Sequence, residues 1–305
     1  CKICFTERIS APAGIRIAID CKSGVIYNFK SKNTMKKEEW LFQVSNIPYD
    51  PDVVKNGLRI KKKLYFTRSP YQKIEVYDTL PFGRVLVLDG IFQTSEKEEF
   101  IYHEMLVHPA MFYCANPEKV LIIGGGDGGV LEEVLKHPVE RVWMVEIDKK
   151  VIEVSKKYLS SISKGAFKDK RAKLIIGDGV KFVKNYQNFF DVIILDLSDP
   201  WGPARKVVSL KFYQGVKKAL KKNGIISVQG GCLFSQREFA SLVFHRLKRV
   251  FSSVVIHKAP VLLYDVGEQN FTVASDVNLK KISLKQIGKK FKKLNLDLKY
   301  YNPEI

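Results

Sequence analysis

Short runs rich in Val, Ile and Leu alternate with amphipathic stretches through the middle of the chain, and this alternation limits the possible folds most strongly. The runs expected to form strands are residues 120–123, 141–147, 173–176, 191–195 and 224–228. The stretches expected to form helices are residues 130–136, 149–158, 210–220 and 236–250. Continuous β-branched runs are typical of strands buried on both faces of a parallel sheet. The pattern predicts a Rossmann-like, methyltransferase-type doubly wound α/β sheet, with late strands at 253–256 and 270–274.

The region before this pattern is different in kind. Runs of Val, Ile and Tyr between residues 58 and 94 are separated by Pro and Gly clusters, which predicts a small antiparallel β unit. Residues 98–114 are expected to be helical, with a break near Pro109. We therefore divide the chain into a leader of unclear role (1–34), an N-terminal β domain (35–97) and a Rossmann-like catalytic domain (98–305).

A glycine-rich loop, Gly124-Gly125-Gly126-Asp127-Gly128-Gly129, directly follows the first predicted strand and opens a helix. In this context glycines let the backbone pass close to a ligand, which predicts an adenosine-containing cofactor. Glu146 ends the next strand, where a carboxylate can accept hydrogen bonds from ribose hydroxyls. Asp178-Gly179 ends the third strand and is placed either to accept from an adenine amino group or to make a simple turn.

Carboxylates gather where the cofactor crevice is predicted. Asp196 and Asp199 end the fourth strand, and two such groups are costly to bury together without a cation. Asp127 adds an acid inside the glycine loop, where its negative charge would repel a bound pyrophosphate. These acids predict a cofactor without phosphates and a cationic substrate.

Longer motifs in fixed order make the resemblance specific. They are Tyr71-Gln72, Leu88-Asp89-Gly90 with Gln93, Tyr102-His103-Glu104-Met105, the glycine loop, Val145-Glu146-Ile147-Asp148, Gly177-Asp178-Gly179, and residues 196–204. From about residue 69 to residue 229, and more weakly to 275, the chain resembles the polyamine aminopropyltransferases of the spermidine synthase family.

The resemblance implies transfer of the aminopropyl group of decarboxylated S-adenosylmethionine to an amine, with release of 5′-methylthioadenosine. The acceptor expected first is putrescine, which gives spermidine; agmatine, cadaverine or a longer polyamine are the alternatives. It also implies a co-substrate rather than a permanently bound cofactor, no metal, and self-association as a dimer or tetramer through the N-terminal β unit.

By matching positions, the resemblance also implies site residues. The nucleoside would be held by Gln72, Glu146, Asp178, Gly179 and Pro203, beside Gly124 and Gly125. Asp127 would bind the amino group of the aminopropyl tail, and Asp196 would be the general base. The amine channel would be lined by Tyr102, His103, Asp199, Gln229 and Tyr264, of which Tyr264 matches only loosely.

Three features depart from the family pattern or carry two interpretations. Leu197 stands where a small hydroxyl residue is usual, and Arg205-Lys206 follows Gly-Pro-Ala in the segment that resembles a gate loop. Both changes bear on acceptor identity more than on reaction type. Glu98 and Glu99 either extend a negative entrance to the site or complement the dipole of their helix, and we favour the helix interpretation.

The formal charge of +19, from 51 Lys and Arg against 32 Asp and Glu, raises the alternative of an RNA methyltransferase on the same fold. Residues 120–200, however, hold 13 Lys and Arg against 12 Asp and Glu. The acids at the site fit a cationic acceptor better than a polyanion, so we expect no nucleic-acid partner. A third alternative is a non-catalytic polyamine or nucleoside sensor, against which the intact base and cofactor residues count.

Five cysteines at irregular spacing form no disulfide framework, and Cys1-x-x-Cys4 lacks the second pair that a closed zinc site needs. No apolar run approaches the ~20 residues that span a bilayer, and the N-terminus does not read as a signal peptide. The expectation is a cytoplasmic enzyme without a membrane partner.

Overall fold

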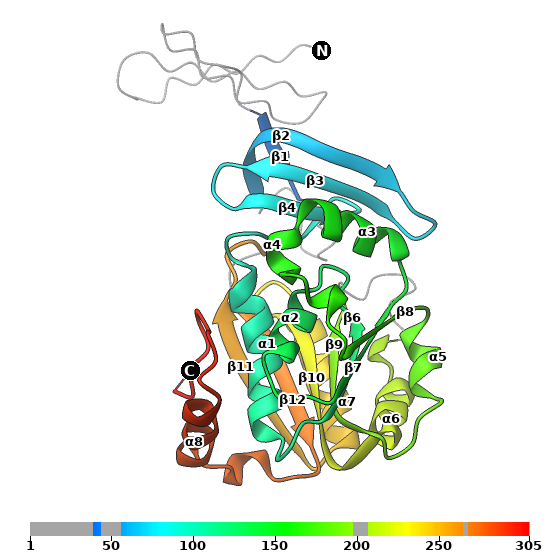
Figure 1. Ribbon diagram of the computed structural model, residues 1–305, viewed down its shortest axis with the longest axis vertical. Helices are drawn as coiled ribbons and strands as arrows, with labels where there is room; N and C mark the ends of the chain where they lie inside the picture. Colours follow the sequence, from blue (N-terminus) through cyan, green and yellow to red (C-terminus); the bar gives the residue numbers. More distant parts are fainter. Residues whose placement is uncertain (1–38, 44–55, 198–206, 265–267, 305) are drawn as a thin grey trace, which may run out of the picture.

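The computed structural model describes residues 39–43, 56–197, 207–264 and 268–304. The predicted leader (1–34), Asp199, Pro203 and the Arg205-Lys206 pair lie outside the described residues. Figure 1 shows an N-terminal sheet stacked on one end of a larger α/β unit. The carboxyl ends of the parallel strands, where the sequence predicts the cofactor crevice, face this smaller sheet.

The N-terminal sheet is a five-stranded antiparallel meander, with its strands side by side in chain order. Its strands are β1 (Glu39–Phe42), β2 (Gly57–Arg68), β3 (Lys73–Thr79), β4 (Gly83–Leu88) and β5 (Ile91–Ser95). The predicted turn at Asp89-Gly90 joins β4 to β5, and both residues adopt positive φ. The Pro and Gly clusters therefore separate the strands as the sequence predicts.

The large sheet has seven strands in the order β11-β12-β10-β9-β6-β7-β8. They are β6 (Lys119–Gly124), β7 (Arg141–Glu146), β8 (Ala172–Ile176), β9 (Phe190–Asp196), β10 (Leu220–Cys232), β11 (Ser253–Pro260) and β12 (Glu268–Ser275). The strands from β10 to β8 are parallel, whereas β12 runs antiparallel to both β10 and β11. The Rossmann-like prediction is confirmed, with a mixed rather than all-parallel sheet.

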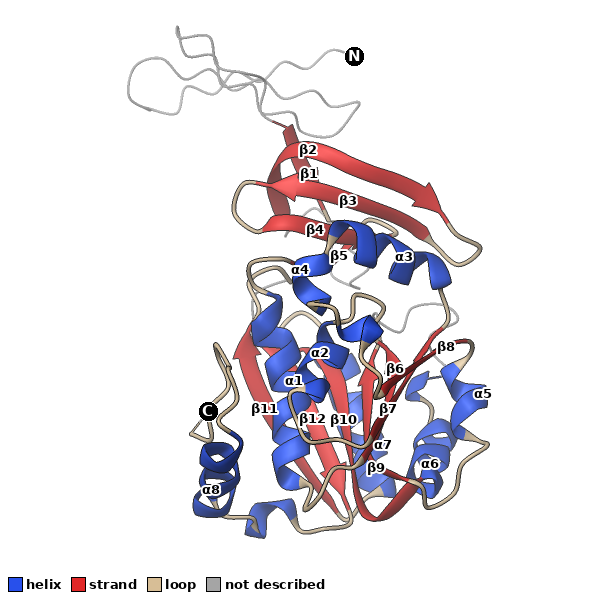
Figure 2. Ribbon diagram, viewed as in Figure 1, coloured by secondary structure: helices blue, strands red, loops and turns tan. Residues whose placement is uncertain are grey.

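Helices cover both faces of this sheet (Figure 2). The α-helices of the described chain are α1 (Glu99–Tyr113), α2 (Gly129–Leu135), α3 (Lys149–Tyr158), α4 (Ser160–Ser163), α5 (Gly179–Val183), α6 (Leu210–Ala219), α7 (Arg237–Val250) and α8 (Leu284–Leu294). One core lies under α1, α2 and α8, and a second lies under α5, α6 and α7. Helices α3 and α4 instead pack their apolar side chains against the N-terminal sheet.

The predicted break near Pro109 is wrong, because α1 continues through it to Tyr113. Proline in a helix interior removes one backbone hydrogen bond, which favours a break in an isolated helix. Here α1 is buried along most of its length, and the Ser227 hydroxyl donates a 2.6 Å hydrogen bond to the Leu106 carbonyl. Tertiary packing therefore keeps the helix intact.

Three α-helices of the described chain were not predicted. α4 and α5 span only four and five residues, too few to leave a clear periodicity. α8 begins with a capping box in which Ser283 and Gln286 satisfy each other's backbone N–H groups, a signal that the sequence does carry. None of the helices in the described chain has both the length and the apolar composition needed to cross a membrane.

Candidate active site

The glycine loop joins the ends of two neighbouring strands. Gly124, Gly125 and Gly128 have φ values of +90°, +76° and +85°, which side chains rarely tolerate. A Cβ on Gly124 would lie 1.9 Å from the Asp196 carbonyl oxygen, and the Gly125 N–H donates to that same oxygen at 3.0 Å. Glycine is thus required for β6 and β9 to end side by side.

A compact polar cluster lies at this junction and brings together four of the predicted site residues. The Tyr102 hydroxyl donates to Oδ1 of Asp196 at 2.8 Å, and His103 Nε2 lies 3.3 Å from Oδ2 of Asp127. Tyr102 and His103 come from α1, Asp127 from the glycine loop and Asp196 from the end of β9. Three segments that are distant in sequence therefore build one acidic crevice.

The two carboxylates of this cluster differ in their electrostatics. Burial, together with the nearby charge of Asp127, raises the pKa of Asp196 to about 6. For Asp127 burial acts in the same direction, but the charge and hydrogen bond of His103 prevail and lower its pKa. Asp127 is therefore held as an anion, whereas Asp196 gains and loses its proton at a pH near 6.

Glu146 and Gln72 meet through a residue for which the sequence suggested no role. Asp148 donates its backbone N–H to Oε1 of Glu146 at 2.8 Å and accepts from Nε2 of Gln72 at 3.0 Å. Burial raises the pKa of Glu146 to about 7. Gln72 from the turn after β2 is thereby tied to the end of β7, so the N-terminal sheet contributes directly to the crevice.

Asp178 and Gly179 lie at the next strand end and make the turn that their dipeptide suggests. Oδ1 of Asp178 accepts from the backbone N–H groups of Val180 and Lys181, at 2.8 and 3.2 Å, and so caps α5. A Cβ on Gly179 would lie 2.2 Å from Ile123, which explains the glycine by close packing. The adenine-binding interpretation of Asp178 remains a prediction beside this structural role.

Tyr264 contacts the polar cluster through Tyr102, whereas Gln229 makes hydrogen bonds to residues outside this cluster. The Tyr264 ring packs edge-on to Tyr102 with centroids 5.7 Å apart, and its hydroxyl donates to the Gln93 carbonyl. Oε1 of Gln229 accepts from Gly231 N at 2.6 Å and Gln269 Nε2 at 2.8 Å. The loosely matched Tyr264 thus stands closer to the acidic crevice, by its contacts, than Gln229 does.

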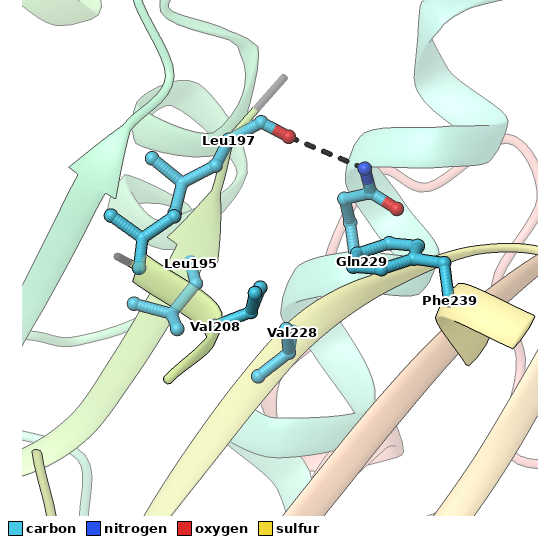
Figure 3. A pocket seen from close by; sticks show the side chains of 7 residues that line it. Leu195, Leu197, Val208, Val228, Gln229 and Phe239 are labelled. Carbon is cyan, nitrogen blue, oxygen red and sulfur yellow. Dashed lines mark hydrogen bonds between the residues drawn. The ribbon is translucent and has the colours of Figure 1, made fainter. Parts of the chain in front are cut away.

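An apolar pocket lies at the carboxyl end of β9 (Figure 3). It is lined by Leu195, Leu197, Val207, Val208, Val228, Gln229 and Phe239. Gln229 donates through Nε2 to the Leu197 carbonyl at 3.3 Å, the dashed contact in Figure 3. Leu197 therefore contributes an apolar side chain to a pocket at the end of β9, although Asp196 is not among the lining residues.

The interpretation of Glu98 and Glu99 as an open entrance is wrong, and dipole complementation does not describe them fully either. They are only 6% and 7% exposed. Glu98 accepts from the backbone N–H groups of Leu262 and Leu263, while Oε2 of Glu99 lies 2.6 Å from Nδ1 of His103. The i, i+4 spacing of Glu99 and His103 was the available signal for this second contact.

One group of side chains in the described residues has the spacing of a metal site. Ligand atoms of His103, Asp127 and Asp196 all lie within 4.8 Å of one another. Both ring nitrogens of His103 face carboxylates, so its lone pairs are not offered to a metal ion. The donor set suits an organic cation better, and the absence of a metal remains a prediction.

Comparison with known proteins agrees with this architecture. Residues 99–286 match the family model described as the spermine/spermidine synthase domain, and residues 40–96 match the spermidine synthase tetramerisation domain. A polyamine aminopropyltransferase of Thermoanaerobacter sp. strain X514 is 42% identical over 251 residues, covering 82% of this chain and 88% of that protein. Polyamine aminopropyltransferase 1 of Aquifex aeolicus is 46% identical over 229 residues, 75% of this chain and 81% of the relative.

The similar solved structures are also spermidine synthases. A spermidine synthase in complex with the transition-state analogue AdoDATO superposes with a TM-score of 0.82 at 37% identity, over 88% of this chain and 90% of that one. The spermidine synthase of Thermotoga maritima gives a TM-score of 0.81 at 37% identity, with the same coverage. The fold defines a Rossmann-like α/β enzyme with an N-terminal β sheet. The chain belongs to the spermine/spermidine synthase family and is an aminopropyltransferase.

Proposed function

We propose that the enzyme transfers the aminopropyl group of decarboxylated S-adenosylmethionine to putrescine, giving spermidine and 5′-methylthioadenosine. The observation that carries the proposal is the meeting of Asp127 and Asp196 in one crevice. In the described part of the chain neither carboxylate pairs with a Lys or Arg side chain, and the Asp127 side chain is 12% exposed. Enclosed carboxylates without such partners favour a cationic ligand.

The nucleoside half of the co-substrate is assigned to the ends of β7 and β8. Glu146 is the proposed acceptor for the ribose hydroxyls, and Gln72 borders the same position through Asp148. Asp178 and Gly179 lie at the adjacent strand end, where Gly177 N donates to the Glu146 carbonyl at 2.9 Å. Pro203 is proposed as a further nucleoside contact and lies outside the described residues.

Asp127 is the proposed partner of the ammonium on the aminopropyl tail. Its lowered pKa keeps it anionic at neutral pH, so it attracts a positive group. Ordinary S-adenosylmethionine carries an additional carboxylate, which would meet like charge at this position. Asp127 therefore supports use of the decarboxylated donor rather than the methyl donor.

The acceptor amine is assigned to Tyr102, His103 and Tyr264 at the acidic crevice, to Gln229 on the neighbouring strand β10, and to Asp199, which lies outside the described residues. An ammonium must lose a proton before its nitrogen can attack the carbon beside the sulfonium. In the proposed step the Asp196 carboxylate takes that proton, the new C–N bond forms, and the C–S bond breaks. The bonding pair returns to sulfur, which leaves as the neutral thioether of 5′-methylthioadenosine.

Purified enzyme supplied with decarboxylated S-adenosylmethionine and separate amines tests the function directly. We expect methylthioadenosine release, with the highest kcat/KM for putrescine against agmatine, cadaverine and spermidine. A higher value for another amine would overturn the acceptor assignment, and no release with any of them would overturn the function. S-adenosylmethionine with RNA serves as the methyl-transfer control.

Replacement of Asp196 tests the proposed base. Asp196→Asn keeps the shape of the side chain but cannot take the proton, so kcat is expected to fall by roughly 10²–10⁴-fold with methylthioadenosine binding retained. Asp276→Asn is the matched control, because Asp276 pairs with Lys217 at the surface and is expected to leave kcat unchanged. Unchanged turnover of Asp196→Asn would refute the role.

We further propose that copies of the chain associate through the N-terminal sheet. The matching tetramerisation domain covers this sheet, and its β1 and β2 expose Trp40, Phe42 and Phe66. Large exposed aromatic side chains on one sheet are typical of an interface. Light scattering is expected to give a multiple of the chain mass, reduced by Phe66→Lys; a monomeric unmodified protein would contradict this.

A further inference from the structure

Glu99 is a buried acid in the first turn of α1 that none of the steps above uses. Its Oε2 lies 2.6 Å from Nδ1 of His103, one helical turn further on. The two side chains are only 5% and 2% exposed, so water screens their interaction little. A close charge pair withdrawn from solvent constrains both partners far more than a surface pair does.

The other ring nitrogen of His103 faces a second carboxylate. Nε2 lies 3.3 Å from Oδ2 of Asp127, so the imidazole bridges Glu99 and Asp127. Ionised carboxylates only accept hydrogen bonds, and a ring that donates to two of them carries a proton on each nitrogen. Burial opposes that charge, but Asp127 and Glu99 together hold the pKa of His103 well above its ordinary value.

The ring is also fixed by its neighbours on other elements. Tyr102 packs edge-on to it at 5.4 Å between centroids, and a Cβ on Gly129 of α2 would lie 2.2 Å from a ring carbon. Among the described residues, the charge of Asp196, at the end of β9, also interacts with the ring. These neighbours hold His103 in one orientation, and the charges of Glu99, Asp127 and Asp196 act on its protonation.

We propose that Glu99 is a positioning residue, which holds His103 doubly protonated and oriented so that Nε2–H fixes the Asp127 carboxylate for the ammonium of the aminopropyl tail. The activity arm of this inference rests on the proposed function. Glu99 neutralises the imidazolium, so the Glu99–His103 pair has no net charge and Asp127 keeps its negative charge for the substrate. Without Glu99, a protonated His103 would cancel Asp127 instead.

This arrangement gives Glu99→Gln a pH-dependent defect. The variant is expected to lower the pKa of His103 into the range of roughly pH 5 to 8. Below that value the imidazolium neutralises Asp127, so kcat/KM for decarboxylated S-adenosylmethionine should fall by at least about tenfold relative to unmodified enzyme. Above it the loss should be smaller. A defect that merely disturbed packing would not follow the His103 titration.

Histidine protonation measured by NMR decides the inference without any enzyme assay. In ¹⁵N-histidine-labelled protein, both ring nitrogens of His103 are expected to stay protonated across neutral pH, with the signal assigned by its loss in His103→Gln. Glu99→Gln is expected to titrate, while Glu99→Asp, which keeps the charge, should raise the midpoint again. Glu98→Gln is the matched control, because Glu98 bonds to backbone N–H groups and not to the ring.

The two arms separate the possible failures. A neutral His103 in the unmodified protein near pH 7, or a Glu99→Gln titration identical to that of the unmodified protein, would overturn the positioning role. Absence of methylthioadenosine release with any amine would overturn the proposed function and leave the NMR result to decide the charge state. If Glu99→Gln does not fold, the Glu99→Asp titration takes its place, with a midpoint below that of unmodified protein expected.

Discussion

The Tyr102 hydroxyl donates a 2.8 Å hydrogen bond to Oδ1 of Asp196, joining two residues that are 94 positions apart in the sequence. Tyr102 lies on α1 and is buried, and Asp196 is the last residue of β9. A hydrogen bond to an ionised carboxylate stabilises the anion. Tyr102 thus lowers the pKa of Asp196, against the larger effect of burial that raises it to about 6.

Tyr102→Phe is therefore expected to move the pH dependence of the reaction. As the proposed base, Asp196 must be ionised, so kcat/KM for the amine should rise as the pH increases through about 6 in unmodified enzyme. Loss of the hydroxyl raises the pKa further, which should shift this acidic limb upward by about one pH unit. The pH profile of kcat/KM gives the measurement.

The size of the defect should depend on pH in a defined way. Near pH 6 the variant should lose activity several-fold, whereas well above both pKa values the two enzymes should converge. Tyr113→Phe, on the same helix but hydrogen-bonded to His257, is the matched control and should keep the original limb. An equal loss at every pH would mean that the hydroxyl acts otherwise than through the Asp196 pKa.

Gly124→Ala is expected to damage both stability and turnover. The new methyl group would lie 1.9 Å from the Asp196 carbonyl oxygen at a φ of +90°, so the backbone between β6 and β9 must shift. We expect a loss of at least about 2 kcal/mol of unfolding free energy, measured by denaturant titration. Gly215→Ala in α6 is the control, since its Cβ would meet nothing within 4 Å and alanine favours helix. Equal stability of the two variants would contradict the steric argument.

The sequence predicted the crevice because its signals are local. Gly124, Glu146 and Asp196 each end an apolar run, and parallel strands place their carboxyl ends at one edge of the sheet. Strand boundaries agreed to within a few residues for the same reason. α8 is not among the predicted helices, although the capping box of Ser283 and Gln286 at its start is visible in the sequence.

Contacts between distant segments were beyond such reasoning. Nothing in the sequence near Glu98 indicates that its carboxylate accepts hydrogen bonds from the backbone of Leu262 and Leu263. The hydrogen bond from Gln72 to Asp148 also depends on how the N-terminal sheet packs against the large domain. The continuity of α1 through Pro109 likewise depends on packing that no local pattern reports. The sequence identifies these acidic residues, but it does not identify the distant groups that they contact.

Binding of methylthioadenosine should weaken as the pH falls. Burial raises the pKa of Glu146 to about 7, and the proposed ribose contacts need the ionised form. Since a protonated Glu146 must lose its proton on binding, the dissociation constant should rise roughly tenfold from about pH 8 to about pH 6. Titration calorimetry at both values gives the test.

Glu146→Gln separates the titration of Glu146 from other effects of low pH on the protein. The variant cannot titrate at this position, so its weaker affinity should be nearly the same at both pH values. Calorimetry in buffers of different ionisation enthalpy should also show protons released on binding to unmodified enzyme below its pKa. Affinity of the unmodified enzyme that does not change with pH would refute ionised Glu146 as the ribose ligand.

Glu104→Ala is expected to detach the C-terminal segment from α1. The buried Glu104 carboxylate accepts backbone N–H groups from Lys299, Tyr300 and Tyr301, at 2.8, 2.8 and 2.7 Å. Removing the carboxylate leaves three backbone N–H donors without their partner. Hydrogen bonds to charged groups contribute more to stability than hydrogen bonds between neutral groups. We expect a loss of about 3 kcal/mol of unfolding free energy.

Local detachment and global destabilisation can be told apart by hydrogen exchange. If Glu104 secures the C-terminal segment, the amides of residues 299–301 should lose protection before those of β6 in the middle of the sheet. Glu153→Ala is the control, because Glu153 pairs at the exposed surface with Lys149 and Lys150 and its loss should leave the denaturation midpoint in place. Unchanged protection at 299–301 in Glu104→Ala would show that packing of Tyr301 beside Phe112 holds this segment without the carboxylate.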